Sequence, residues 1–281
     1  MRSDRDCRVQ EVTATATTFT SDHRGGDGPP LVLLHGFLDT WRSWELVLPA
    51  LERRCAVFAP TLPGHAGGPP IDGDNSPTAL LDMLERMLDA AEITTAHIAG
   101  NSLGGFAALQ LAARGRALSV TALAPAGGWS ADDPGRIDAV TDLLRIHEQA
   151  QIAAPFADAV AATPDGRRQL TSQITVAYEH IPAELLAHQL VGVARCTGAN
   201  VLSDGVAEHG WPDLHADRID CPVRVVWGTE DRVLHWPTAA VRYREEWLPD
   251  ADWVELDGVG HCPQLDVPDV TAALIGDWAT T

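Results

Sequence analysis

The sequence contains no lysine, since all 20 of its basic residues are arginine. This absence excludes a Schiff-base lysine, a Ser-Lys dyad and the lysine of a Walker A phosphate loop. The arginines form no cluster, and the formal net charge is −19 at pH 7. Because cationic contacts to phosphates dominate nucleic-acid binding, we expect no nucleic-acid partner.

Cysteine is scarce, and the five cysteines are scattered without a C-x-x-C pair. Such an odd, dispersed set favours neither a disulfide framework nor a structural zinc site. Long apolar runs are missing too, and none approaches the ~20 residues that a membrane span needs. Residues 1–6 are rich in charge and precede no apolar segment typical of a secretory signal. We therefore expect a cytoplasmic protein with no membrane span.

Alternating strand-like and helix-like segments make up the first part of the chain. Short apolar runs have the composition of strands covered on both faces, and helical periodicity separates them. The runs are residues 31–34, 55–59, 96–99 and 118–123, and the helical segments are residues 41–51, 76–91 and 103–114. This alternation predicts βαβ units, and hence a mainly parallel sheet with helices on both faces.

The N-terminal residues differ from this pattern because they are rich in β-branched side chains. Residues 8–13 and 14–20 predict two antiparallel edge strands, and the glycine- and proline-rich residues 21–30 predict a loop.

From residue 129 to residue 214 the chain shows only helical patterns and polar turns. One helix is expected to begin near Asp133 and another at Pro182, with breaks at residues 163–166 and 200–205. The strand and helix alternation then resumes, with strands at residues 222–227 and 253–256 and helices at residues 238–247 and 267–278. An all-helical insert between two strands of one sheet is typical of a lid.

Three segments follow from this organisation. We expect a first part of an α/β core over residues 1–126, a helical lid over residues 127–215, and the second part of the core over residues 216–281.

The stretch Gly100-Asn101-Ser102-Leu103-Gly104 lies between an apolar strand and a helix. A serine at such a sharp corner is held in strained backbone geometry, with its hydroxyl exposed to attack a substrate. The helix that begins at Leu103 presents unpaired N–H groups beside this hydroxyl. Taken alone, the pattern fits an ordinary glycine-rich turn equally well.

Two further side chains follow predicted strands of the same sheet. Asp231 comes after the strand at residues 222–227, and His261 comes after the strand at residues 253–256. Loops at the carboxyl ends of parallel strands meet at one edge of the sheet, so we expect Ser102, Asp231 and His261 to converge. A serine nucleophile needs a base to take its proton and an acid to orient that base.

The sequence resembles the α/β-hydrolase superfamily over the whole chain except the helical insert. The resemblance lies in four motifs in order: Leu33-Leu34-His35-Gly36-Phe37, Gly100 to Gly104, Trp227-Gly228-Thr229-Glu230-Asp231, and Gly258-Val259-Gly260-His261. It implies the α/β-hydrolase fold, with a mainly parallel twisted sheet, flanking helices and an inserted all-helical lid.

This resemblance also implies roles for individual residues. Ser102 is the nucleophile, His261 the base and Asp231 the acid that orients it. The backbone N–H groups of Phe37 and Leu103 form the oxyanion hole. The chemistry needs no metal and no cofactor.

Other residues compete for these roles. His35, His65 and His235 are alternative bases, but none of them follows the last strand. Glu230 is an alternative acid beside Asp231.

We expect a serine hydrolase that cleaves a carboxylic ester, or a related acyl bond, of a small and largely apolar molecule. Serine rather than aspartate at position 102 disfavours dehalogenase and epoxide-hydrolase chemistry. Trp129 and Trp236 are expected to line the substrate pocket. Carbon–carbon bond hydrolysis of ring-cleavage products and cofactor-free perhydrolysis remain open as enzymatic alternatives. A ligand-binding or biosynthetic protein that retains the triad is an alternative of another class. The sequence does not decide the oligomeric state.

Overall fold

A seven-stranded sheet is the centre of the molecule in the computed structural model, which describes residues 17–71, 73–130 and 133–279. The strand order is β1-β3-β2-β4-β5-β6-β7, and every neighbouring pair is parallel except β1 with β3. The strands are β1 (Asp22–Gly25), β2 (Pro30–Leu34), β3 (Ala56–Pro60), β4 (Ala96–Asn101), β5 (Ala117–Leu123), β6 (Val223–Gly228) and β7 (Asp252–Leu256). The predicted mainly parallel sheet is confirmed.

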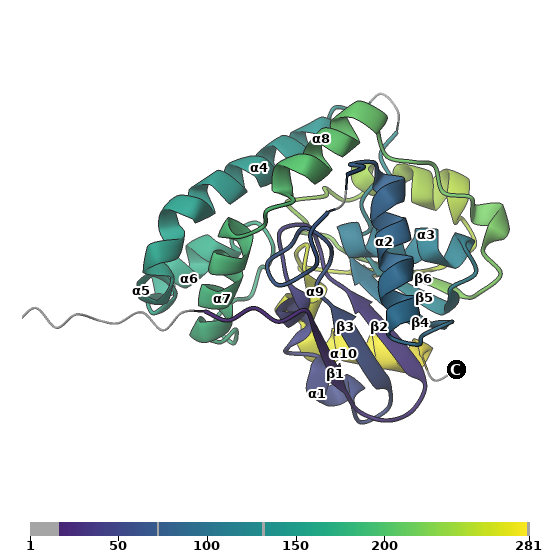
Figure 1. Ribbon diagram of the computed structural model, residues 1–281, viewed down its shortest axis with the longest axis horizontal. Helices are drawn as coiled ribbons and strands as arrows, with labels where there is room; N and C mark the ends of the chain where they lie inside the picture. The colour runs from purple at the N-terminus through teal and green to yellow at the C-terminus, as the bar shows by residue number, and fades with distance from the viewer. Residues whose placement is uncertain (1–16, 72, 131–132, 280–281) are drawn as a thin grey trace, which may run out of the picture.

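Helices cover both faces of this sheet (Figure 1). They are α1 (Leu48–Leu51), α2 (Pro77–Ala90), α3 (Leu103–Ala113), α4 (Gly135–Ala153), α5 (Ala157–Ala161), α6 (Pro164–Thr171), α7 (Ala183–Ala194), α8 (Ala199–His209), α9 (Pro263–Asp266) and α10 (Pro268–Trp278). Shorter 3₁₀ turns and one π-type turn connect them.

The continuous apolar run of the central strand β2 is explained by the two core clusters on either side of the sheet. Leu31 and Leu33 pack with α1 and α10 in one core cluster, whereas Val32 and Leu34 pack with α2 and α3 in another. Successive side chains of a strand point to opposite faces, so a sheet covered on both faces needs apolar residues at every position.

Between β5 and β6 the described residues form the helices α4–α8 and short 3₁₀ turns, and no strand. Figure 1 shows α4–α8 gathered together on one side of the core. Side chains of α5 and α7 form their own apolar cluster, which continues into Cys262 and Leu265 of the core. No helix in the described part of the chain is both long and apolar enough to cross a membrane.

The N-terminal strand prediction is wrong for the residues that can be checked. Residues 8–13 lie outside the described part, and residues 17–20 are not a strand. The edge strand is β1, inside the segment predicted as a loop, and it pairs antiparallel with β3. The free backbone N–H and C=O groups of β3 pair with the segment that lies beside them in the fold. This tertiary contact outweighs the high β-propensity of the residues that precede β1.

The predicted break at residues 200–205 is also wrong, because α8 runs through it. A Cβ at Gly205 would overlap the carbonyl oxygen of Asn75. This glycine therefore allows a close helix contact and does not end a helix. At residues 163–166 the turn signal marks the start of α6, where the Thr163 hydroxyl accepts a hydrogen bond from the Gly166 N–H.

Candidate active site

Ser102 lies at the sharp corner between β4 and α3, with φ of 55° and ψ of −115°. A non-glycine residue with such a positive φ is strained and persists only when its surroundings fix it. A Cβ at Gly100 would overlap the carbonyl of Gly104, and one at Gly104 would overlap the carbonyl of Leu34. Both glycines are therefore needed for the backbone to pack this closely around Ser102.

Asp231 and His261 form a buried pair, and each is 4% exposed. His261 Nδ1 lies 2.7 Å from Asp231 Oδ2. The other carboxylate oxygen of Asp231 accepts hydrogen bonds from the backbone N–H groups of Val233 and Leu234, at 2.9 and 2.7 Å. These bonds fix the carboxylate, so Nδ1 of His261 carries the proton and Nε2 is left as the basic nitrogen.

Asn101 connects the serine turn to the histidine loop. Its side-chain amide donates to the carbonyl oxygens of His261, at 2.9 Å, and Leu123, at 3.2 Å. Its Oδ1 accepts from Gln264 Nε2 at 3.1 Å and from Cys262 Sγ at 3.3 Å. Asn101 is 1% exposed, so this network is sheltered from water and holds His261 in register with Ser102.

Replacement of Asn101 by alanine is expected to lower kcat/KM for an ester by about 100-fold, because the His261 loop loses its tie to the serine corner. Steady-state kinetics at several pH values and thermal unfolding check this result. The matched control is Ser119→Ala, which removes the partly buried hydrogen bond between Ser119 on β5 and His97 on β4. Equal losses of activity in the two variants would contradict a positioning role for Asn101.

Asp266 ties the helical segment to the same loop. Its carboxylate accepts three backbone N–H groups, those of Val176, Ala177 and Gly260, at 2.9, 2.7 and 2.7 Å. The Cys262 N–H donates to the carbonyl of Ile174 at 2.8 Å. The linker between α6 and α7 therefore supports the loop that carries His261.

Phe37 and Leu103, the predicted oxyanion donors, both line the cavity above Ser102. A Cβ at Gly36 would lie 3.4 Å from the Ser102 Cβ, so this backbone passes directly beside the serine. Among the described residues neither the Phe37 nor the Leu103 backbone N–H donates a hydrogen bond. Both are thus free to bind a developing negative charge.

His35 orients one of these donors. Its Nδ1 donates to the Gly36 carbonyl at 2.7 Å, and its Nε2 accepts from the Leu62 N–H at 2.9 Å. The Gly36 carbonyl and the Phe37 N–H belong to one trans peptide, in which they point in opposite directions. The bond from His35 therefore turns the Phe37 N–H away from the histidine. With both ring nitrogens occupied, His35 is not available as a base.

The other competing histidines are placed differently. His65 is 3% exposed, and burial lowers its pKa to about 4. Burial and the neighbouring His65 also hold the pKa of His35 well below its ordinary value. His235 is exposed. Both buried histidines are therefore neutral at pH 7.

Acid is expected to destabilise the protein through His65. In the unfolded chain His65 is protonated below its ordinary pKa of 6.5. In the folded protein it is protonated only below its lowered pKa of about 4. The free energy of unfolding therefore falls as the pH drops through this window, by about 3 kcal/mol in total. Urea unfolding across the window checks this, with His65→Asn expected to flatten the slope. The exposed His215 provides the control, and an equal flattening in His215→Asn would contradict the assignment.

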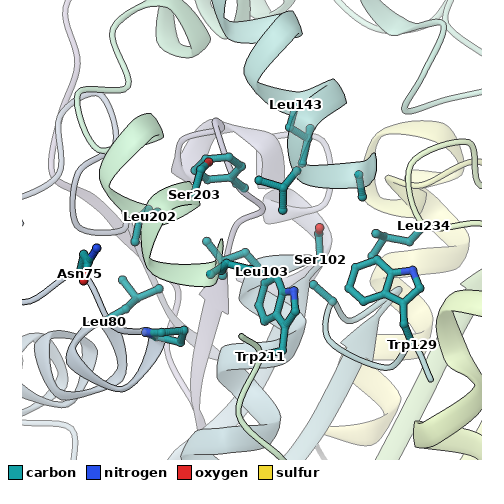
Figure 2. A pocket seen from close by; sticks show the side chains of 16 residues that line it. Asn75, Leu80, Ser102, Leu103, Trp129, Leu143, Leu202, Ser203, Trp211 and Leu234 are labelled. Atoms are coloured by element: carbon teal, nitrogen blue, oxygen red, sulfur yellow. The ribbon is translucent and has the colours of Figure 1, made fainter. Parts of the chain in front are cut away.

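Ser102 opens into a cavity with about 610 Å³ of empty space, its open mouth included. Trp129 lines this cavity beside Leu234, as Figure 2 shows. Trp236 does not line it, contrary to the sequence prediction. Its ring packs between Trp227 and Trp253, with centroid distances of 5.8 and 6.3 Å. Aromatic side chains close to a site in sequence are often used for core packing, and Trp236 is one of them.

Comparison with known proteins agrees with this architecture. The model of the alpha/beta hydrolase family matches residues 31–274. The chain belongs to this family. An epoxide hydrolase, EphH, from Mycobacterium tuberculosis is 34% identical over 219 residues, which cover 71% of this chain and 93% of that protein. A pimeloyl-[acyl-carrier protein] methyl ester esterase from Chromobacterium violaceum is 30% identical over 261 residues, covering 85% and 90%.

Among solved structures, a thermophilic esterase from Thermogutta terrifontis superposes with a TM-score of 0.69 at 20% identity, covering 92% of each chain. At this identity the likeness concerns the fold alone. The chain thus has the α/β-hydrolase fold that its motifs predict.

Sequence reasoning missed the positioning roles of Asn101 and Asp266. Asn101 lies inside the serine motif, and a buried amide at a strand end is a signal that could have been used. Asp266 offers no such signal, because two of its three donors, the N–H groups of Val176 and Ala177, lie far from it along the chain.

Proposed function

We propose that this chain is a serine hydrolase that cleaves a carboxylic ester of a small, largely apolar molecule. The observation that carries the proposal is the strained Ser102 on the wall of an apolar cavity, with its neighbour Asn101 bonded to the loop of the Asp231–His261 pair. Relatives that carry the names of an esterase and an epoxide hydrolase support hydrolase activity. The helical lid, residues 127–215, would close the cavity.

In the first half-reaction the Ser102 hydroxyl attacks the ester carbonyl while His261 Nε2 takes its proton. The backbone N–H groups of Phe37 and Leu103 hold the oxyanion, each contributing about 3 kcal/mol. His261 then returns the proton to the leaving alcohol, and the acyl group stays on Ser102. In the second half-reaction a water molecule is deprotonated by His261 and attacks the acyl-enzyme. The acid leaves as Ser102 regains its proton.

Epoxide opening is the competing reaction, since it gives its name to a relative of 34% identity. A carboxylate that opens an epoxide forms an ester, which water can hydrolyse. A serine that opens an epoxide forms an ether, which water does not hydrolyse under these conditions. Ser102 therefore favours acyl transfer over epoxide hydrolysis in this chain.

A fluorophosphonate probe tests the proposed nucleophile directly. Stoichiometric labelling of Ser102, identified by mass spectrometry, is the expected result. A panel of ester, epoxide and vinylogous diketone substrates then separates ester hydrolysis from epoxide and carbon–carbon bond hydrolysis. Labelling of another residue, or turnover confined to epoxides or diketones, would contradict ester hydrolysis by Ser102.

A further inference from the structure

The loop that follows β5 forms one wall of the cavity above Ser102. Ala126 and Trp129 of this loop line the cavity, and Figure 2 shows Trp129 with Leu234 on one side of Ser102. The part of the cavity lined by Ala126, Trp129 and Leu234 is its Trp129 end. The shape of this end therefore depends on how the loop is held.

Two residues give this loop an unusual backbone. Ala124 has φ of 40° and Gly127 has φ of 95°. A positive φ is rare for a residue with a side chain, and an alanine keeps it only when surrounding contacts fix the backbone. Contacts from other segments must therefore constrain the loop.

Tyr243 supplies one such contact, from the π-type turn Tyr243–Trp247. Its hydroxyl donates a hydrogen bond to the Ala126 carbonyl at 2.7 Å, and the residue is 1% exposed. Burial raises the pKa of this hydroxyl far above its ordinary value, so the group keeps its proton and stays a donor. The bond is sheltered from water, which strengthens it.

The backbone of the same segment also lies against the loop. The Arg242 N–H donates to the Gly128 carbonyl at 2.8 Å. A Cβ at Gly128 would overlap the ring of Tyr243 and lie 2.7 Å from the Ala239 carbonyl oxygen. The glycine thus allows the ring to pack directly on the loop, with its hydroxyl on the Ala126 carbonyl.

The serine corner is held by bonds of its own. The Ser102 N–H donates to the Leu123 carbonyl at 2.9 Å, and the Ser102 carbonyl accepts from the Phe106 N–H at 2.9 Å. The Ala126 N–H is a further contact to this corner, at 3.1 Å from the Ser102 carbonyl oxygen. Loss of the Tyr243 hydroxyl is therefore expected to displace the cavity wall more than the nucleophile.

We propose that Tyr243 is a positioning residue that determines which substrates the Trp129 end accepts. It acts by holding Ala126 and Trp129 where a bulky apolar group of the ester packs against them. Without the hydroxyl bond the wall shifts and the close fit to a bulky group is lost, whereas a small group does not reach the wall. This inference rests on the proposed function, because Ser102 fixes where the ester lies.

Two pairs of esters that differ only by a phenyl ring measure this fit. One pair is methyl propanoate and methyl 3-phenylpropanoate, and the other is ethyl acetate and 2-phenylethyl acetate. In at least one pair, kcat/KM for the phenyl ester is expected to exceed that for its small partner by about tenfold or more, because the ring buries apolar area. A ratio near one in both pairs would overturn the proposal.

Tyr243→Phe is expected to lower this ratio about tenfold, chiefly through KM for the phenyl ester, and to leave kcat/KM for the small ester within about twofold. The variant also unfolds at a lower temperature, because the Ala126 carbonyl loses a buried hydrogen bond. A loss of folded protein reduces both rates alike, so the ratio reports on positioning alone. The matched control is Tyr178→Phe, since Tyr178 is the other tyrosine of the chain and does not line the cavity. An unchanged ratio in Tyr243→Phe, or an equal change in Tyr178→Phe, would overturn the proposal.

A double-mutant cycle tests whether Tyr243 acts through the wall. Trp129→Leu is expected to lower the ratio by itself, since it removes much of the surface that the phenyl ring contacts. Adding Tyr243→Phe to this variant should then change the ratio little further, because the two residues act on one contact. The parent ratio in Trp129→Leu, or effects of the two substitutions that simply multiply, would contradict action through Trp129.

Binding to the Ser102→Ala variant keeps the inference testable without turnover. The ligands are 4-phenyl-2-butanone and 5-phenyl-2-pentanone, ketones that match the two phenyl esters and cannot be hydrolysed. Calorimetry is expected to show at least one of them bound about tenfold more weakly once Tyr243→Phe is added. Should the parent hydrolyse none of the four esters, ester hydrolysis fails while this measurement still decides the role of Tyr243. Equal affinities with and without Tyr243→Phe overturn the positioning role alone.

Discussion

Replacement of Ser102 by alanine is expected to lower kcat/KM for the best ester substrate by at least about 10⁴-fold. The variant keeps the cavity and the two backbone donors, so it binds substrate but forms no acyl-enzyme. The Ser102 side chain makes no capping hydrogen bond to α3, and alanine has the same Cβ in the same strained backbone. The unfolding temperature is therefore expected to stay close to that of the parent.

Steady-state kinetics with parallel thermal unfolding measure this effect, and the fluorophosphonate probe should no longer label the variant. Cys262 is the nearby group that could imitate a nucleophile. Burial raises the pKa of its thiol well above the ordinary value, and the Asp39 and Asp231 carboxylates add to this shift. Its thiolate form is therefore suppressed at neutral pH. Retained activity in Ser102→Ala would refute the proposed nucleophile.

Asp231→Asn is expected to lower kcat/KM at neutral pH by about 10⁴-fold, through the wrong tautomer of His261. One carboxylate oxygen of Asp231 is occupied by the Val233 and Leu234 N–H groups. The asparagine oxygen must take that place, which directs its NH₂ group at His261 Nδ1. A donor there requires Nδ1 to be unprotonated, so the proton moves to Nε2. The base that should receive the Ser102 proton is then lost.

Kinetics over a range of pH values check this prediction. The control is Glu230→Gln, because Glu230 is the adjacent carboxylate that competes for the acid role in the sequence. The control is expected to keep most of the parent activity, since the carboxylate bonded to His261 is that of Asp231. A severe loss in Glu230→Gln together with a mild loss in Asp231→Asn would exchange the two assignments.

The core of the fold could be predicted from local patterns. Continuously apolar strands such as β2 identify a sheet covered on both faces, and the helical pattern over residues 76–91 matches α2, which Ser76 caps just before Pro77. These signals are local because strand burial and helix capping depend on residues that are neighbours in sequence. The edge strand β1 was not predicted. Which segment forms this strand depends on pairing with the free backbone of β3 and not on amino-acid composition.

In the candidate site, too, some features could be predicted from the sequence, whereas others depend on the tertiary structure. Ser102, Asp231 and His261 follow strand ends, and parallel strands bring their carboxyl ends together, so topology alone predicts that they converge. Their catalytic roles stay a prediction until the variants above are measured. Asn101 lies inside the serine motif, but its bond to the His261 carbonyl joins segments that only the fold brings together. The packing of the Trp236 ring against Trp227 and Trp253 is likewise set by the folded chain and not by a local pattern.

The sequence by itself determined the family, the parallel sheet and the strained corner at Ser102, because each is encoded in short motifs whose backbone demands are local. Gly100 and Gly104 illustrate this, since the packed turn leaves no room for a Cβ at either position. Only the tertiary structure decided the shape and polarity of the cavity above that serine. Trp129 and Leu202 line it from segments far apart in the chain, and long-range contacts such as the hydrogen bond from Tyr243 to Ala126 hold its walls in place.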